Sequence, residues 1–138
     1  MTAAPAPKQL TTAIQAVLPE ALAAWVYGSA ASGSMHAASD IDVAVLLPFS
    51  DVRRTAWLLK HEAQRLADIW GFPVDLVNFT TVSCVLQKEV LSAGRLLYSF
   101  DDFAVGVAEL QALSQYRDFN ERNACEFERI AQTGKVFA

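Results

Sequence analysis

The fold is decided by residues 25–48, which read WVYGSAASGSMHAASDIDVAVLLP. Two apolar strands are predicted here, one ending at Gly28 and one opening at Ile41, because both runs are rich in β-branched and aromatic residues. The loop between them consists mainly of alanine, serine and glycine, whose small side chains leave the backbone open to a ligand. The stretch therefore predicts an anion-binding loop beside two carboxylates, Asp40 and Asp42.

Length and composition restrict the class of protein. The 138 residues, 53% of them hydrophobic, suffice for one core and are too few for two ordinary domains. We expect a single domain over residues 1–138, with residues 1–7 flexible and residues 101–138 forming a helical C-terminal segment. The net charge of −4 disfavours direct nucleic-acid binding. Two widely spaced cysteines and the lack of a signal-peptide-like or membrane-spanning run predict a cytoplasmic protein that binds no membrane.

Helices and strands alternate along the chain, which predicts an α/β or α+β sheet with helices packed on it. Large apolar side chains at helical spacing, such as Trp57 and Phe103, are expected in the core. The helix after the third strand is expected to begin at a cap formed by Thr80 or Thr81. The predicted helices cover residues 8–18, 29–33, 52–70, 82–91 and 101–135, and the predicted strands cover residues 22–27, 41–47, 74–79 and 96–98.

Asp40 and Asp42 form the first candidate metal site. Residues two apart on a strand point to the same face, so these carboxylates project together, with their backbones roughly 6 to 7 Å apart. Two adjacent carboxylates at the start of an apolar strand repel each other unless a bound cation neutralises their charge. Hard oxygen ligands of this kind favour Mg²⁺ or Mn²⁺, and Mg²⁺ commonly takes substrate phosphate oxygens as further ligands.

Asp75 lies at a comparable place on the next predicted strand. If that strand pairs with the strand of Asp42, the two carboxylates share a face. Three carboxylates around paired ions suit two-metal chemistry, in which one ion activates the attacking oxygen and the other stabilises the leaving group. Asp75 is then expected to act as the base, or as a metal ligand, for an incoming hydroxyl.

Gly28 and Ser29 form the predicted phosphate site. Glycine lets the backbone approach a phosphate closely, and Ser29 offers its hydroxyl and N–H at the start of a helical turn. Ser39 is expected to orient the turn before Asp40 and to support nucleotide binding. Taken alone, Gly28 and Ser29 are more often an ordinary strand exit with a serine cap. The combination with two aspartates opening an apolar strand is far less expected by chance, and it favours the functional interpretation.

A known family shares this arrangement. Gly28, Ser29, a spacer of ten residues, and then Asp40 and Asp42 opening a strand resemble the signature of the DNA polymerase β-like nucleotidyltransferases. The small size, the strand around Asp75 and the segment GRLLY at residues 94–98 are similar to the minimal nucleotidyltransferase branch, called MNT. The resemblance covers residues 22–101.

The resemblance implies a fold and a reaction. The fold would be a mixed central β-sheet flanked by helices, and the reaction would be Mg²⁺-dependent transfer of AMP from ATP to an acceptor. By the match, Gly28 and Ser29 hold the triphosphate, Asp40 and Asp42 hold the metals, and Asp75 serves the acceptor side. Similar proteins often act as antitoxins that adenylylate a tyrosine of a HEPN-domain ribonuclease toxin. Many relatives carry a basic residue in the spacer, where this chain has only His36.

Two other functions compete with this one. A small-molecule nucleotidyltransferase of the aminoglycoside-modifying kind uses the same chemistry, but the chain is short for a second lobe that would enclose such a substrate. A non-catalytic antitoxin would mask its partner sterically, and the charged segment 117–135 suits such docking. The intact set of Gly28, Ser29 and three aspartates argues against a vestigial site.

Overall fold

The structure is a computed structural model that describes residues 4–33, 39–48 and 52–133. The chain forms a four-stranded mixed sheet flanked by helices. The strand order is β3-β2-β1-β4; β1 runs antiparallel to β2 and β4, and β2 runs parallel to β3. This confirms the predicted mixed sheet. The elements in chain order are α1 (Pro7–Val17), β1 (Ala23–Tyr27), α2 (Ser29–Ser32), β2 (Ile41–Leu46), α3 (Val52–Trp70), β3 (Val74–Asn78), α4 (Cys84–Ala93), β4 (Arg95–Ser99) and α5 (Asp102–Thr133).

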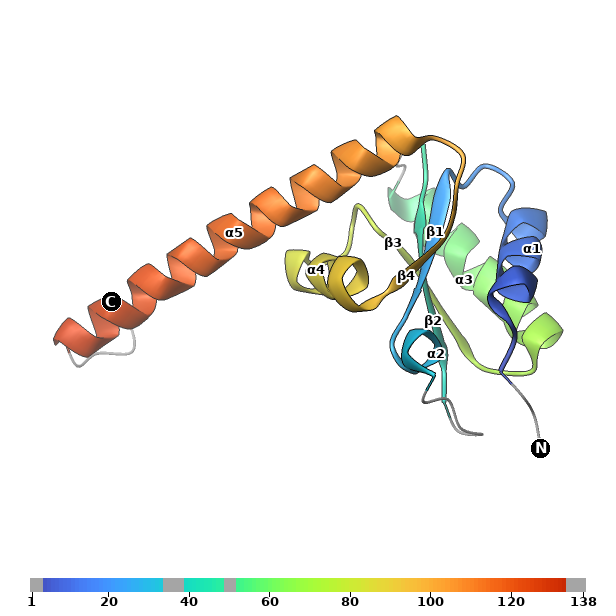
Figure 1. The fold of residues 1–138 in the computed structure, drawn as a ribbon, viewed down its shortest axis with the longest axis horizontal. Helices are drawn as coiled ribbons and strands as arrows, with labels where there is room; N and C mark the ends of the chain where they lie inside the picture. Colours follow the sequence, from blue (N-terminus) through green and yellow to red (C-terminus); the bar gives the residue numbers. More distant parts are fainter. Residues whose placement is uncertain (1–3, 34–38, 49–51, 134–138) are drawn as a thin grey trace.

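Two layers of helices bury the two faces of the sheet (Figure 1). Helices α1 and α3 pack on one face, where the core includes Ile14, Val43 and Leu66. Helix α4 and the first turns of α5 pack on the other face, where Trp25 stacks on Phe79 with ring centroids 4.7 Å apart. Because β1 and β2 are covered on both sides, their sequences are almost continuously apolar. A carboxylate on β2 is therefore an exception that needs a reason.

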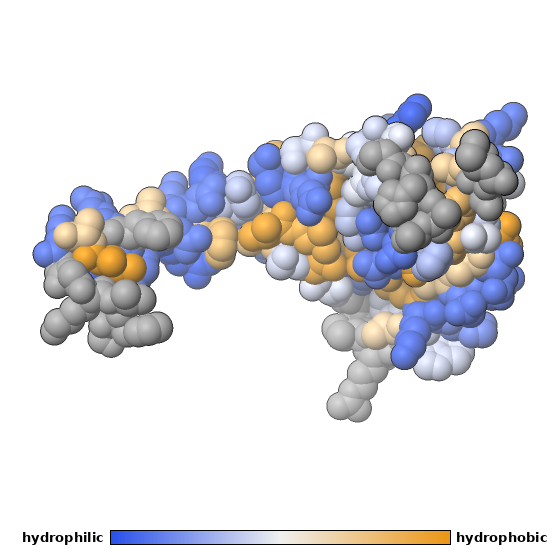
Figure 2. All heavy atoms as spheres, turned by 90° about the horizontal axis from the view of Figure 1, so that it is seen from below, coloured by the Kyte–Doolittle hydropathy of each residue, from blue (hydrophilic) through white to orange (hydrophobic). Residues whose placement is uncertain are grey.

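Helix α5 extends far beyond the sheet (Figure 1). Its first turns contribute Val105, Ala108 and Ala112 to the core, while its distal half is largely exposed. The prediction that large apolar side chains at helical spacing are core residues is wrong for Phe103, which is 81% exposed, and for Trp57, which is 67% exposed. Both helices do turn an apolar face to the sheet, but other residues occupy it, such as Leu66 on α3 and Val105 on α5. Figure 2 shows apolar residues gathered at the root of α5.

The start of α4 differs from the prediction. Ser83, rather than Thr80 or Thr81, caps the helix, and its hydroxyl accepts a hydrogen bond from the N–H of Leu86 at 3.2 Å. Thr80 and Thr81 are instead held by Asn78, whose side-chain oxygen accepts from the Thr80 N–H at 3.3 Å and whose backbone carbonyl accepts from the Thr81 hydroxyl at 3.2 Å. The turn after β3 thus uses both threonines before the helix begins.

Replacing Ser83 by alanine is expected to lower the free energy of unfolding by about 1 kcal/mol, because the capped N–H loses its acceptor. Urea denaturation measures this change. Ser92→Ala is the matched control, since Ser92 lies on the same helix and its hydroxyl only donates to the Lys88 carbonyl. Equal unfolding free energies for the two variants would contradict the assignment of Ser83 as the cap.

Within the ranges that the structure describes, no helix combines the length and apolar character that crossing a membrane requires.

Candidate active site

Strand pairing brings Asp42 and Asp75 together. Parallel pairing of β2 with β3 sets Asp42 opposite Asp75, and antiparallel pairing of β1 with β2 sets Tyr27 opposite Asp42. Residues opposite each other on neighbouring strands project from the same face of a sheet. The three side chains therefore form a row on the face that α4 and α5 cover. The strand pairing on which the shared face of Asp42 and Asp75 was conditional is therefore present.

Asp40 lies just before β2, two residues from Asp42, and its side chain is exposed. The N–H of Ile41, between the two aspartates, donates to the carbonyl of Pro73 at 2.8 Å and ties this point to the start of β3. Ser39 is buried directly before it. The paired aspartates thus lie at the end of β2 that adjoins the loop after α2, while His36 of that loop lies outside the described residues.

Gly28 is shaped by its contact with Asp42. Its backbone has φ +66° and ψ −147°, a region open essentially to glycine alone. A Cβ atom at this position would collide with Oδ2 of Asp42 and would lie 3.5 Å from Cγ of the same residue. The carboxylate of Asp42 therefore occupies the space that any other residue would fill with its side chain.

Helix α2 begins immediately after Gly28, with Ser29 as its first residue. The Gly28 carbonyl accepts from the N–H groups of Ala31 and Ser32, each at 3.2 Å, and Gly33 ends the turn in the left-handed conformation. The short helical turn expected over residues 29–33 is confirmed. Ser29 is half-buried and directly follows Gly28, the glycine against which the Asp42 carboxylate packs.

The site is strongly acidic. Burial raises the pKa of Asp42 above its ordinary value, and the negative charges of Asp75, Asp40 and Glu89 raise it further. Burial also raises the pKa of Tyr27 from 10.0 to about 12, with Asp75, Asp42 and Glu89 adding to the effect. These shifts have a common cause, because several carboxylates face one another across a partly buried space. Such a cluster is stabilised when a cation binds.

The ion pairs found among the side chains that the structure describes lie outside this cluster. The ion pairs within the described ranges join Arg65 to Glu62 and Arg129 to Glu126, and neither pair involves the site. The described residues also include no group of three His, Cys, Asp or Glu side chains close enough to enclose a metal ion by themselves. An open set of carboxylate oxygens fits Mg²⁺, which keeps water ligands and is completed by substrate phosphates.

Two residues near the Asp42 and Asp75 carboxylates, Glu89 and Tyr27, were not among the predicted site residues. Glu89 lies on α4, and its charge acts on both Asp42 and Tyr27. Tyr27 was expected only as a buried strand residue, although it directly precedes Gly28. For Glu89 no sequence signal was available, because the face of the sheet that α4 covers follows from the topology. Tyr27 could be placed near Asp75 only once the strand order was known, because that order sets β1 two strands from β3.

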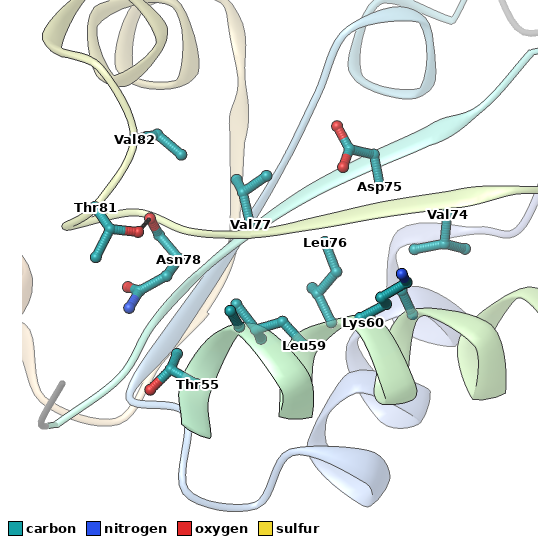
Figure 3. A pocket seen from close by; sticks show the side chains of 12 residues that line it. Thr55, Leu59, Lys60, Val74, Asp75, Leu76, Val77, Asn78, Thr81 and Val82 are labelled. Atoms are coloured by element: carbon teal, nitrogen blue, oxygen red, sulfur yellow. Dashed lines mark hydrogen bonds between the residues drawn. The ribbon is translucent and has the colours of Figure 1, made fainter. Parts of the chain in front are cut away.

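A cavity of about 400 Å³ runs along β3 and reaches Asp75 (Figure 3). Asp75 and Val77 point to one side of the strand, whereas Val74 and Leu76 point to the other side, toward Leu59 on α3. The cavity therefore connects the acidic face of the sheet with the edge of β3.

Comparison with known families gives one extended match. The family model described as "Polymerase beta, Nucleotidyltransferase" matches residues 8–103, which include all four strands. The protein adenylyltransferase MntA of Shewanella oneidensis strain MR-1 is 35% identical to the chain over 81 residues. This alignment covers 59% of the chain and 56% of MntA, so the chain spans a little over half the length of this relative.

Solved structures share the fold. A chain in a crystal structure of a toxin–antitoxin with AMP-PNP superposes with a TM-score of 0.74 at 23% identity, covering 91% of this chain and 98% of that one. A chain in the structure of the tri-AMPylated Shewanella oneidensis HEPN toxin in complex with its MNT antitoxin gives a TM-score of 0.67 at 20% identity, covering 91% and 95%. At these identities the likeness concerns the fold alone.

Proposed function

Because the chain belongs to the polymerase beta nucleotidyltransferase family, we propose that it transfers AMP from ATP to a hydroxyl group of a protein. The observation that carries this proposal is the register of Asp42 with Asp75, next to the glycine turn of Gly28 and Ser29. Asp42 and Asp75 share one face, and the Asp42 carboxylate packs against Gly28. This arrangement suits a reaction in which phosphates and divalent ions must be aligned.

The residues divide the work as follows. Gly28 and Ser29 would hold the triphosphate, and Asp40 and Asp42, together with Asp75, would hold Mg²⁺ or Mn²⁺. Ser39 supports the turn that presents Asp40. When bound, the divalent ion neutralises the phosphate charge that develops in the transition state.

Asp75 serves the acceptor. Its carboxylate orients the acceptor hydroxyl and receives its proton, as the oxygen forms a bond to the α-phosphorus of ATP. The bond from the α-phosphorus to the bridging oxygen breaks at the same centre, and pyrophosphate leaves. The position of Asp75 at the rim of an open cavity supports this role, because an acceptor can reach it from solvent.

The proposed acceptor is a tyrosine of a HEPN-type toxin encoded beside this chain, with which it forms a hetero-oligomer as antitoxin. Two comparisons support this choice. MntA, with 35% identity, is named a protein adenylyltransferase, and one structure of the same fold holds an AMPylated HEPN toxin with an MNT antitoxin. We place the reaction in the cytoplasm, where ATP and Mg²⁺ are available and where the free thiols of Cys84 and Cys125 stay reduced.

Co-expression with the protein from the neighbouring reading frame tests the function. We expect intact-mass spectrometry to show the partner carrying AMP on tyrosine with the wild-type chain and unmodified with the Asp40→Ala, Asp42→Ala double variant. Circular dichroism checks that the double variant is folded. A tight complex without AMP would instead support masking of the partner, and transfer retained by the double variant would contradict the site.

A further inference from the structure

The outer edge of β3 is open. β3 is the terminal strand of the sheet, and in the described ranges no other strand lies beyond it. Its inner edge pairs with β2 through odd-numbered residues: the Pro73 carbonyl accepts from Ile41 at 2.8 Å, and the Phe79 N–H donates to Val45 at 2.9 Å. Since backbone groups along a strand alternate in direction, the even-numbered residues of β3 direct theirs away from the sheet.

Three even-numbered residues of β3, Val74, Leu76 and Asn78, direct their backbone groups outward. The carbonyl of Asn78 already accepts from the N–H of Thr81 at 3.0 Å, which leaves Val74 and Leu76 with both groups available. Within the described part of the chain, no backbone hydrogen bond to the outward groups of Val74 or Leu76 is found. A row of outward donors and acceptors on an edge strand matches the backbone of another extended chain.

The space beside this edge is large enough for such a chain. The cavity of about 400 Å³ is lined by side chains from both faces of β3, with Asp75, Val77 and Val82 above the strand (Figure 3). Below it lie Leu76 and, from α3, Leu59 and Lys60. A cavity that includes both faces of one strand lies at the strand's edge, where an added strand would run.

We propose that an extended segment of the acceptor protein adds to the outer edge of β3, so that its hydroxyl-bearing residue lies in register with Asp75. This inference rests on the proposed function and specifies how the acceptor is bound. Continuity argues for this occupant, because the edge groove and the proposed catalytic site share Asp75. A second copy of the chain is disfavoured, since pairing two β3 edges would set two Asp75 carboxylates on one face of one sheet in a chain of net charge −4.

The register explains how the acceptor meets the reacting groups. A residue opposite Asp75 on an added strand has its Cβ about 4.5 to 5.5 Å from that of Asp75 and projects from the same face. Its hydroxyl is then beside the carboxylate that receives the proton when the new oxygen–phosphorus bond forms. The neighbouring residues of the segment point to the opposite face, toward Leu59 and Lys60. Apolar or acidic residues adjacent to the modified residue are therefore favoured.

Two variants block the edge in different ways. Ala56→Trp fills the groove from α3, where Ala56 is exposed and lines the cavity. Val74→Pro removes an outward N–H without removing a hydrogen bond to β2. The matched control for Ala56→Trp is Gln64→Trp, at an exposed site of α3 outside the groove, and circular dichroism checks that Val74→Pro is folded.

With the neighbouring HEPN protein as acceptor, we expect both edge variants to raise the KM for that protein at least about tenfold, as expected for a lost hydrogen bond or blocked contact. Gln64→Trp should keep the KM within about twofold of the wild type, a change of less than about 0.5 kcal/mol. Binding of AMP-PNP with Mg²⁺, followed by calorimetry, should be unchanged in all three variants, because none of them replaces Gly28, Ser29 or one of the three aspartates.

A second measurement does not depend on turnover. In a complex of the Asp42→Asn variant with the same HEPN protein, the amides of Val74 and Leu76 should become protected from hydrogen exchange. No AMP transfer by the wild-type chain would overturn the proposed function and this inference with it. Normal transfer by both edge variants, or no protection of these amides in the complex, would overturn the inference alone. A wild-type dimer that Ala56→Trp dissociates would assign the edge to a second copy and likewise overturn it.

Discussion

Asp42→Asn is expected to reduce AMP transfer by at least about 10³-fold while leaving the fold as stable as the wild type or more stable at neutral pH. Activity falls because an amide replaces the charged oxygen that would hold the divalent ion. Stability does not fall, because the carboxylate is partly buried among Asp75, Asp40 and Glu89, and its charge is disfavoured there. Radiolabelled transfer and thermal unfolding measure the two effects.

The direction of the pH dependence follows from the raised pKa of Asp42. Since the folded state binds this proton more tightly than the unfolded state, the carboxyl favours folding at acid pH and loses this contribution as the pH rises through its folded pKa. The difference in Tm between Asp42→Asn and the wild type should therefore grow from about pH 4 to about pH 8 in EDTA. Mg²⁺ with AMP-PNP should narrow it by stabilising the wild type.

Asp118→Asn is the control for this series, because Asp118 is an exposed carboxylate of α5 outside the acidic cluster. Its Tm should follow that of the wild type at every pH. Transfer retained by Asp42→Asn would refute the role of this residue in catalysis. A Tm well below the wild type at neutral pH would show that the carboxylate makes a stabilising interaction rather than a repulsive one.

Gly28→Ala is expected to lower the free energy of unfolding by about 2 to 4 kcal/mol and to reduce transfer by about 10²-fold or more. The new methyl group would collide with the Asp42 carboxylate, and the backbone at φ +66° and ψ −147° is strained for alanine. Both effects displace the group that the reaction needs. Denaturant unfolding and transfer assays on the same preparation provide the measurement.

Gly33→Ala separates strain from collision. Gly33 also has positive φ, at +75°, but a Cβ there would meet nothing within 4 Å. This control should cost about 1 kcal/mol and leave transfer nearly intact. In an Asp42→Ala background, Gly28→Ala should cost less than in the wild type, since the collision partner is gone. Strict additivity of the two substitutions would contradict the contact between Gly28 and Asp42.

The strands were predictable because local pattern determines them. Residues 25–48 are apolar where the sheet buries them on both faces, and small where the chain turns at Gly28. The pairing of β2 with β3, which sets Asp42 opposite Asp75, could be predicted only as a condition, because strand order depends on contacts between distant segments. Glu89 was missed for the same reason, since its place depends on the face that α4 covers.

Two local predictions were wrong for a different reason. Thr80 and Thr81 are good helix caps in isolation, but the buried Asn78 binds both threonines in the turn after β3. Trp57 and Phe103 have the spacing of core residues, yet each lies on the side of its helix that faces away from the sheet. Periodicity identifies an amphipathic helix more reliably than it identifies which apolar side chains are enclosed.

The two halves of helix α5 are stabilised in different ways. Its 32 residues correspond to a rod of about 48 Å, but only the turns around Val105, Ala108 and Ala112 are anchored in the core. Those turns unfold with the domain. The distal turns depend on local terms such as the Arg129–Glu126 pair, and an unsupported helix of that length is marginal in water. Their helix–coil equilibrium is therefore separate from the stability of the catalytic sheet, and any molecule that packs against them can shift it at little cost to the site.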